Sequence, residues 1–425
     1  MTMFSPRQDI NRALSNNYPE HLKRSLIDRR EKLLALAGAA GDASGHHEPP
    51  PPLPDERNPE FEAAAACVEL KLTGESKRRV FATRDIHVGE VISVERPFSF
   101  TLAAADLYHC HDCFELCYNP IPCDSCSQSL YCGEACKVSA WDKYHKYECP
   151  ILISLKNIVG KHKAFLLAVK MSFLIEDESQ ASDVYKLTEN LDKEHIRDEL
   201  FTTALVTALM FHLVKKYTTK FEGATRQAEE KFKELLMLHL RICLIHAAGI
   251  DELCPNVIDG EHRLLNFRSE TVGCALFPFY SFLGHACCPN VFAHHHGVTR
   301  VLRAIRTIRK GQECLVSYGP YYIEHNKADR QSRLLSQYHL TCKCRACVDD
   351  WPQLDLLPYQ VTSQEDYAFL GDIRNASVDV AKSSIHRFID GVRYFEDLEP
   401  YMDLTLQQKM LSYCYDVLGN KRQVL

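Results

Sequence analysis

Apolar residues recur at helical spacing in three parts of the chain, and this periodicity predicts α-helices. The first part covers residues 10–36, the second about 151–249, and the third runs from residue 348 to the C-terminus. The repeat in the first part is formed by Leu14, Leu22, Leu26, Leu33 and Leu34. We interpret the middle part as mostly scaffold.

Short β-type runs lie between these helical parts. Residues 80–82 and 91–94 flank Gly89, an arrangement that predicts a hairpin. Two further runs, 298–305 and 314–318, are separated by a Lys-Gly turn. The order along the chain is therefore strand pieces, a cysteine-rich block, helices, more strand pieces, a second cysteine group and terminal helices.

Residues 37–59 lose all periodicity, and their glycines and four consecutive prolines predict a linker. Elsewhere the composition is that of a globular protein, with 46% hydrophobic and 25% charged residues over 425 positions. By the usual prior of roughly 100 to 200 residues per domain, this length predicts two to four domains.

Charge and hydropathy exclude several classes of protein. The net charge of −6 argues against a dedicated nucleic-acid-binding surface. No apolar run approaches the roughly 20 residues of a membrane span, and residues 1–12 are too polar for a signal peptide. We therefore expect a soluble intracellular protein with no membrane contact, located in the cytoplasm, the nucleus or both.

The chain holds 19 cysteines, and in a reducing compartment their clustered spacing indicates metal binding more than disulfides. Two tetrahedral zinc sites need eight ligands. One segment offers that number in four spaced pairs, namely Cys110-x2-Cys113, Cys123-x2-Cys126, Cys132-x3-Cys136 and His145-x3-Cys149.

Each pair supplies half of a site, because both spacings direct two ligands toward one ion. We expect interleaved pairing, although spacing alone does not prove it. Cys110, Cys113, Cys132 and Cys136 would then hold one ion, and Cys123, Cys126, His145 and Cys149 the other. The alternative is that these thiols are buried apolar groups, which is our interpretation of Cys67, Cys243 and Cys414.

This block resembles the MYND zinc finger at all eight ligand positions and at Trp141, which precedes the His-x3-Cys pair. Both sites look closed, so the zinc is expected to be structural. The resemblance implies a protein-interaction module that often binds proline-containing peptides. Nucleic-acid binding is the weaker alternative.

Residues 67–347 as a whole resemble the SET and MYND domain family of protein-lysine methyltransferases. The opening segment 80–91 is similar to the start of a SET domain. Residues 284–290, Gly-His-Ala-Cys-Cys-Pro-Asn, resemble the central Asn-His-Ser-Cys-x-Pro-Asn motif. Gly311-Gln312-Glu313 and Tyr318 follow, as a Gly-Glu-Glu turn and the active-site tyrosine do in the family.

The resemblance implies an α+β fold, in which a split β-rich SET domain carries an inserted finger and a helical insert. We place the N-terminal helices and linker at 1–60, the first SET part at 61–108, the finger at 109–149, the helical insert at 150–250, the SET core at 251–340, the post-SET turn at 341–350 and the C-terminal helices at 351–425.

Cys342-x-Cys344-x2-Cys347 resembles the post-SET cysteines and is one ligand short of a tetrahedron. In the family the cysteine of the central motif completes the set, and Cys287 is its counterpart. The resemblance thus implies three zinc ions, two in the finger and one at the post-SET turn. The alternative is a turn with buried thiols.

The chemistry that the resemblance implies is methyl transfer from S-adenosylmethionine to a lysine amine of a protein substrate. The amine must be neutral, so the site must lower its pKa by desolvation and by proximity to the sulfonium charge. By resemblance, the Tyr318 hydroxyl would orient the amine and the methyl group. The alternative is a strand tyrosine that faces the core.

The positions that bind the cofactor in the family differ here. Lys77, Arg78 and Arg79 replace a Gly-x-Gly-like turn, and their side chains should crowd the cofactor. Three further contacts are replaced by His246, Gly284 and Leu340, whereas His285 and Tyr318 remain. Each lost contact should cost about 1 kcal/mol of binding.

Two functions therefore compete. The first is a lysine methyltransferase with a degraded cofactor motif, and the second is a catalytically weak or silent adaptor or corepressor scaffold that binds partners through the finger. A transcription factor that binds DNA through the finger is disfavoured by the excess of acidic residues.

The flanks resemble tetratricopeptide-like helices. This resemblance implies that the chain starts inside such an array or has a shortened one. It also implies that residues 403–425 open a C-terminal repeat domain that is truncated or frayed.

Overall fold

The computed structural model describes most of the chain from Glu48 onward. The described residues are 23–24, 27–28, 48–74, 77–103, 106–117, 119–126, 128–159, 163–175, 178–191, 196–257, 264–361 and 377–422. The predicted N-terminal helices lie outside these residues, apart from four positions between 23 and 28 that are helical. The linker prediction is described only from residue 48, where the chain is irregular up to residue 54.

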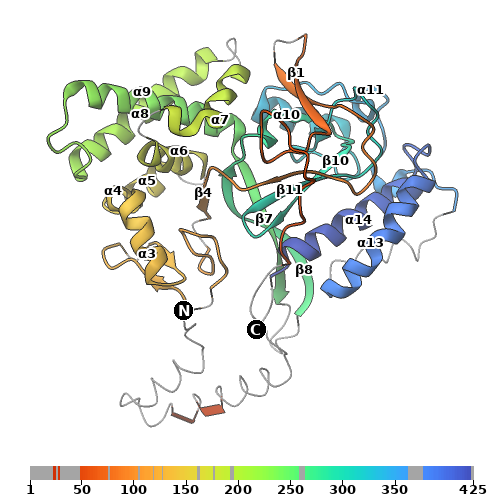
Figure 1. Cartoon of the computed structure of the whole chain (residues 1–425), viewed down its shortest axis with the longest axis horizontal. Helices are drawn as coiled ribbons and strands as arrows, with labels where there is room; N and C mark the ends of the chain where they lie inside the picture. The colour runs from red at the N-terminus through yellow and green to blue at the C-terminus, as the bar shows by residue number, and fades with distance from the viewer. Residues whose placement is uncertain are drawn as a thin grey trace.

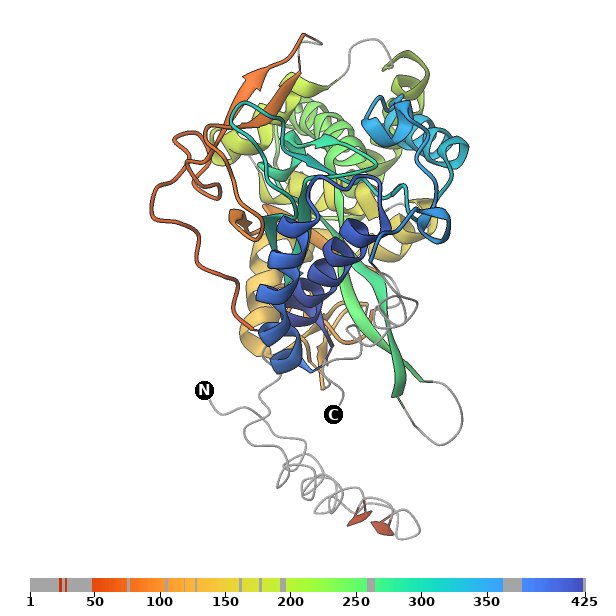
Figure 2. The same ribbon diagram turned by 90° about the vertical axis from the view of Figure 1, so that its right-hand side faces the viewer.

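Three antiparallel sheets lie between the helical flanks of the molecule (Figure 1). The first pairs β1 (Val68–Leu72) with β2 (Arg78–Ala82). The second has the order β10 (Val291–His296), β11 (Thr299–Ala304), β3 (Val91–Glu95). The third has the order β4 (Ser99–Leu102), β8 (Leu264–Leu276), β7 (Ala248–Val257), and its β7–β8 ribbon extends away from the body in Figure 2.

The predicted hairpin around Gly89 is wrong, although both of its strands exist. β2 pairs with β1, and β3 pairs with β11, far away in sequence. Gly89 forms a turn with φ of 88°, and its N–H donates to the Ala304 carbonyl at 2.8 Å. Apolar alternation tells which face of a strand is buried but does not identify its partner. The predicted strand over 298–305 is confirmed as β11.

A short parallel pair of strands, called the β9–β12 crossing below, brings two distant motifs together. β9 (Gly284–His285) pairs with β12 (Leu315–Val316), so the predicted strand over 314–318 is only two residues long. The Asn290 side chain fixes the crossing, because it donates to the Glu313 carbonyl at 2.8 Å and accepts from the Leu315 N–H at 2.7 Å. The segment that ends at Tyr318 therefore lies beside the central motif.

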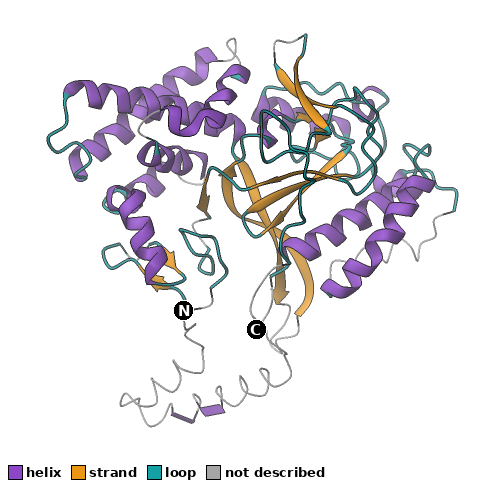
Figure 3. Ribbon diagram, in the orientation of Figure 1, coloured by secondary structure: helices purple, strands orange, loops and turns teal. Residues whose placement is uncertain are grey.

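Helices gather on the two flanks of the sheets (Figure 3). On one flank are the finger and the insert, formed by α3 (Glu134–Ala140), α4 (Lys146–Glu148), α5 (Leu152–Val159), α6 (Lys163–Leu174), α7 (Ser182–Tyr185), α8 (Ile196–Tyr217) and α9 (Arg226–His246). On the other side are α10 (Lys327–Tyr338), α11 (Arg345–Val348), α13 (Val378–Tyr394) and α14 (Met402–Asn420). Short 3₁₀ turns are η2 (Glu178–Ala181), η3 (Lys186–Asn190), η4 (Tyr280–Phe282) and η5 (Leu354–Leu356).

The insert is held by α6, whose residues 166–173 are all buried. Inside it, His239 of α9 is bonded on both ring nitrogens, to Ser172 at 2.8 Å and to the Tyr185 hydroxyl at 2.7 Å. α14 lies directly on β10, since a Cβ at Gly419 would stand 2.0 Å from the His295 carbonyl oxygen. Only glycine permits this approach of helix and strand.

Buried charges join the finger to the rest of the molecule. His109, at the entry to the finger, lies 2.8 Å from Asp106 and 3.4 Å from Glu252 of β7. Arg422 donates to the same Glu252 at 2.8 Å. Burial alone would lower the pKa of His109, but the hydrogen bond to Asp106 and the nearby charge of Glu252 outweigh it and raise the pKa to about 9. The imidazole is therefore charged at neutral pH.

Candidate metal centres and active site

The first finger group consists of Cys110, Cys113, Cys132 and Cys136. All four sulfurs lie within 4.8 Å of one another. Cys132 Sγ is 3.6 Å from both Cys113 Sγ and Cys136 Sγ. A zinc ion at about 2.3 Å from each sulfur of a tetrahedron separates them by about 3.8 Å, so the spacing fits this metal.

The second finger group consists of Cys123, Cys126, His145 and Cys149. Cys123 Sγ lies 3.9 Å from Cys149 Sγ, and Cys126 Sγ lies 3.5 Å from His145 Nε2. The two strands of a short ribbon, β5 (Ile121–Pro122) and β6 (Leu130–Tyr131), flank the Cys123-x2-Cys126 turn. The structure thus brings together the interleaved sets that the spacing favoured.

Glu148 is a residue of this group that the sequence analysis missed. Its carboxylate lies 3.1 Å from His145 Nδ1, and both side chains are buried. A hydrogen bond at Nδ1 leaves Nε2 free to face the sulfurs, as metal-binding imidazoles require. Burial opposes ionisation of Glu148, but the bond to His145 dominates and its pKa is lowered. The sequence did contain a signal for this contact, because a glutamate three residues after a histidine lies on the same face of a helix.

The third group joins Cys287 to Cys342, Cys344 and Cys347. Cys287 Sγ lies 3.5 Å from Cys347 Sγ and 4.0 Å from Cys342 Sγ. Arg330 of α10 is fully buried and donates to Cys347 Sγ at 3.8 Å and to the Ala346 carbonyl at 3.0 Å. A buried guanidinium beside these sulfurs favours their negatively charged form, a role that the sequence did not reveal.

Tyr318 is fixed beside the β9–β12 crossing. Its hydroxyl donates to the Leu283 carbonyl at 2.6 Å, and its backbone N–H donates to His285 Nδ1 at 3.0 Å. The other ring nitrogen of His285 lies 3.4 Å from Cys287 Sγ. Burial lowers the pKa of His285 to about 4 and raises that of Tyr318, so both side chains are neutral.

Tyr338 of α10 completes an aromatic wall at this point. Its ring lies 4.9 Å from that of Tyr318, centroid to centroid, and its hydroxyl donates to the Tyr318 carbonyl at 3.1 Å. It is 36% exposed, so this end of the aromatic pair reaches solvent. The sequence analysis missed it, because a tyrosine at the end of a helix has no distinctive signal.

The space beside Gly284 is filled by another side chain. A Cβ added there would stand 2.5 Å from Glu313 Oε1 and 2.9 Å from Leu315 Cδ2. Arg79 of β2 faces the same carboxylate, with its Nε 3.9 Å from Glu313 Oε1. An ion pair therefore covers Gly284.

The other predicted cofactor residues have different surroundings. Arg78 is held by Glu60 at 2.6 Å, so it is engaged away from Glu313. His246 ends α9, and its buried Nε2 has no hydrogen-bond partner among the described residues. Burial, followed by the charge of Arg79, lowers its pKa to about 4. Leu340 is half-buried against the core around the third cysteine group, and Lys77 is half-buried just before β2.

Residues 77–319 match the SET domain family, which is more than half of the chain. The chain belongs to the SET domain family. This match confirms the predicted α+β class with a SET domain, and it covers the finger and the helical insert as well as the β9–β12 crossing. It also ends directly after Tyr318.

The curated relatives are SET and MYND proteins. The chain is 25% identical over 380 residues to "Protein-lysine N-methyltransferase SMYD4" of Mus musculus, covering 69% of this chain and 47% of that protein. It is 22% identical to the Homo sapiens protein of the same name, covering 80% and 59%. To "N-lysine methyltransferase SMYD2" of Mus musculus it is 24% identical over 278 residues, covering 64% and 58%. The chain spans about half the length of these relatives.

Among the solved structures that align with the chain is the "SET domain of LSMT bound to Lysine and AdoHcy". The TM-score is 0.24 at 10% identity, over 83% of this chain and 85% of that one, and carries no inference. In the part of the SET-domain chain that is described, no helix combines the length and the apolarity needed to cross a bilayer.

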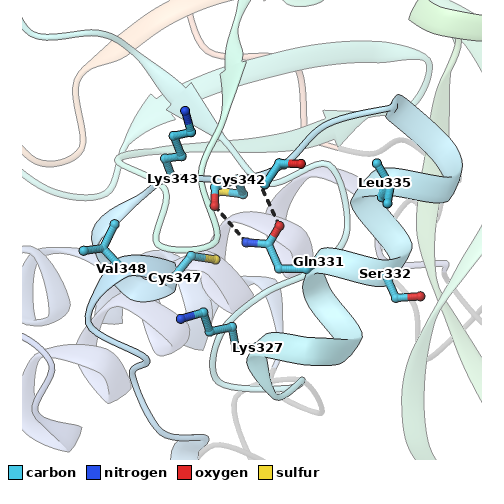
Figure 4. A pocket seen from close by; sticks show the side chains of 9 residues that line it. Lys327, Gln331, Ser332, Leu335, Cys342, Lys343, Cys347 and Val348 are labelled. Atoms are coloured by element: carbon cyan, nitrogen blue, oxygen red, sulfur yellow. Dashed lines mark hydrogen bonds between the residues drawn. The ribbon is translucent and has the colours of Figure 1, made fainter. Parts of the chain in front are cut away.

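A hollow of about 480 Å³ lies outside the SET crossing, between α10 and the post-SET turn (Figure 4). Gln331 closes its inner side, because its amide donates to the Cys342 carbonyl at 2.8 Å and accepts from the Cys342 N–H at 3.1 Å. The lining residues are Lys327, Gln331, Ser332, Leu335, Thr341, Cys342, Lys343, Cys347 and Val348. None of the candidate cofactor residues lines it, so it is separate from the site at Tyr318.

Proposed function

We propose that this protein is a protein-lysine N-methyltransferase that uses S-adenosylmethionine. The observation that carries the proposal is the fixed Tyr318 hydroxyl on the Leu283 carbonyl, beside His285, in a chain that matches the SET domain. Relatives named as lysine methyltransferases support the reaction class.

The polar groups around Gly284 suit the chemistry of the cofactor, while the Glu313 side chain lies over the glycine itself. His246 offers a buried ring nitrogen without a hydrogen-bond partner among the described residues, and Arg79 and Glu313 offer both charges. We propose that the cofactor-binding residues are Lys77, Arg78, Arg79, His246, Gly284, His285, Tyr318 and Leu340. S-adenosylmethionine supplies a methyl group on a sulfonium, so that the N–C bond forms as the S–C bond breaks and a thioether leaves.

The chain itself must bind the substrate lysine, exclude water from the site and orient the amine for attack. The Tyr318 and Tyr338 rings form an apolar wall that favours the neutral amine, whose proton goes to solvent before attack. The Tyr318 hydroxyl is held by a backbone carbonyl and by strand geometry, so it orients the amine without a conformational cost.

We propose that the three cysteine groups hold three structural zinc ions, two in the finger and one beside Cys287. The ligand sets are closed, with four protein ligands each, and leave no position for a reactant. We further propose that the finger binds a protein partner, such as a proline-containing peptide. The exposed Val138 and Trp141 lie on its surface, which suits an apolar ligand.

The test is titration of the purified protein with S-adenosylmethionine, followed by a methyl-transfer assay on lysine-containing protein. Wild type should bind and transfer, and Tyr318→Phe should bind the cofactor with similar affinity but lose at least 10-fold in turnover. Absence of binding at millimolar cofactor would refute the enzyme proposal and leave the fold assignment intact.

A second candidate is a catalytically silent adaptor, and it is favoured by the ion pair that covers Gly284. If this pair excludes the cofactor, partner binding through the finger is the remaining activity. Cys123→Ser should then abolish binding of a proline-containing peptide, while Tyr318→Phe has no effect on any activity. Loss of methyl transfer in Tyr318→Phe would eliminate this candidate.

A further inference from the structure

The hollow between α10 and the post-SET turn carries positive charge, although the chain as a whole is acidic. Two of its lining residues are lysines, and none of them is an aspartate or a glutamate. Lys327 is the first residue of α10, and Lys343 belongs to the post-SET turn. Figure 4 shows these two lysines on opposite sides of Gln331. The hollow therefore receives a positive charge from each of the two elements that form it.

The described part of the chain does not neutralise these charges. Among the described residues, the side chains of Lys327 and Lys343 have no hydrogen-bond, ion-pair or ring partner. The carboxylate nearest to Lys327 in sequence is that of Asp329, which accepts from Asn326 Nδ2 at 2.8 Å and does not line the hollow. Two like charges at one hollow repel each other, so they do not stabilise the fold.

The same hollow has an apolar part. Leu335 of α10 is 55% exposed and Val348 of α11 is 67% exposed, and both line it. A ligand that covers these side chains removes apolar surface from water, which favours binding. The inner side is rigid, because the Gln331 amide is bonded to the Cys342 backbone. The volume of about 480 Å³ is that of an ordinary ligand pocket.

The alternative is that the lysines only offset the charge of the third cysteine group, since Cys342 and Cys347 line the hollow too. That group already has a partner in Arg330, which is fully buried and donates to Cys347 Sγ at 3.8 Å. Lys343 is exposed, so water and salt screen its charge from the sulfurs. Its accessible ammonium group is better placed for a ligand in solution.

We propose that this hollow binds an acidic segment of a partner protein. Its carboxylates lie on Lys327 and Lys343, and one apolar side chain lies on Leu335 and Val348. Charge complementarity selects this ligand, because two unpaired ammonium groups without a competing carboxylate attract an acidic chain. A simple anion such as phosphate has no group to cover the apolar part. None of the candidate cofactor residues lines the hollow, so this binding is an activity separate from the proposed methyl transfer.

The test is fluorescence anisotropy of the full chain at low ionic strength with a labelled peptide, Asp-Glu-Leu-Asp-Glu. Lys327→Gln and Lys343→Gln should each weaken its binding by roughly 5-fold, the contribution of one exposed charge pair. Leu335→Ala should weaken it by a similar factor, because it removes part of the apolar contact. Wild type should bind Asn-Gln-Leu-Asn-Gln and Asp-Glu-Ser-Asp-Glu more weakly, since the first lacks the charges and the second lacks the apolar side chain.

Lys310→Gln is the matched control, because Lys310 is also an exposed lysine in a turn but does not line the hollow. It should bind the peptide like wild type. Lys343→Gln should keep the wild-type zinc count in native mass spectrometry. Joint loss of zinc and peptide would show that this lysine serves the cysteine group, and would overturn the inference.

Three other results would also overturn the inference. The first is a wild type that does not bind the peptide, or binding that Lys327→Gln, Lys343→Gln and Leu335→Ala all leave unchanged. The second is tighter binding of a single-stranded oligonucleotide of equal charge, which would indicate a nucleic-acid site. The third is a wild-type dimer that Lys343→Glu dissociates, which would show that a second copy of the chain occupies the hollow. Absence of methyl transfer would refute the proposed function alone.

Discussion

The backbone N–H of Tyr318 donates to Nδ1 of His285 at 3.0 Å. The same ring places Nε2 3.4 Å from Cys287 Sγ, so one imidazole connects the candidate catalytic residue to a candidate metal ligand. His285→Ala leaves the Tyr318 amide without this acceptor, which costs roughly 1 to 3 kcal/mol for a buried group. We expect a lower melting temperature and at least 10-fold slower methyl transfer. His87→Ala, at an exposed position, is the control and should change neither quantity.

The finger should depend on zinc for its fold. Cys123→Ser removes one ligand of the second group, and we expect native mass spectrometry to count one zinc ion fewer than in wild type. Since zinc binding is coupled to folding, the finger should lose several kcal/mol of stability. Cys117→Ser lies in the same segment but outside the three groups, and it should keep the wild-type zinc count. A folded wild-type protein with no bound zinc would contradict this prediction.

Glu148 should tune the zinc affinity of the same group through His145. Replacing it by glutamine weakens the hydrogen bond at Nδ1, and changes of this kind typically cost 10 to 100-fold in metal affinity. Competition with a chromogenic chelator measures the effect. Glu134→Gln changes an exposed carboxylate of α3 in the finger, paired with Lys137, and should release zinc like wild type. Equal release by both variants would show that Glu148 does not orient the imidazole.

Stability should fall in alkaline solution because of His109. Its pKa is raised to about 9, above the ordinary value of 6.5, so its contribution is complete below pH 6.5 and is lost as the pH rises through 9. Its partners Asp106 and Glu252 have lowered pKa values, so their contribution is lost in acid instead. A shift of this size corresponds to about 3 kcal/mol. Thermal unfolding between pH 6.5 and 9.5 should show the decline, and His109→Gln should flatten it.

The two cysteine groups of the finger could be expected because their signal is local. A Cys-x2-Cys turn directs both thiols to one point, whereas the interleaved pairing was only favoured by the pattern, and the structure brings those sets together. Cys287 could be assigned to the third group only from the resemblance to SET domains, since no local spacing connects it to Cys342. The partner of β3 could not be predicted, because β11 is distant in sequence and alternation identifies faces alone.

The sequence also could not predict that the Glu313 side chain lies over Gly284. The absent asparagine indicated a lost contact, but the presence of Glu313 in its place depends on the β9–β12 crossing and on the bridge to Phe81. Arg78 is held by Glu60, and the charge that faces Glu313 is that of Arg79. Which of several neighbouring charges faces a site is decided by tertiary pairing, and the sequence order of Lys77, Arg78 and Arg79 does not reveal it.

The bridge between Phe81 and Glu313 has a consequence for the order in which the chain folds. It closes a loop that contains the finger and the whole helical insert, and closing so long a loop is entropically costly. The finger has ligands close together in sequence, so it can mature on its own while the loop is still open. We therefore expect the contact between β2 and the segment around Glu313 to be the last part of the domain to form.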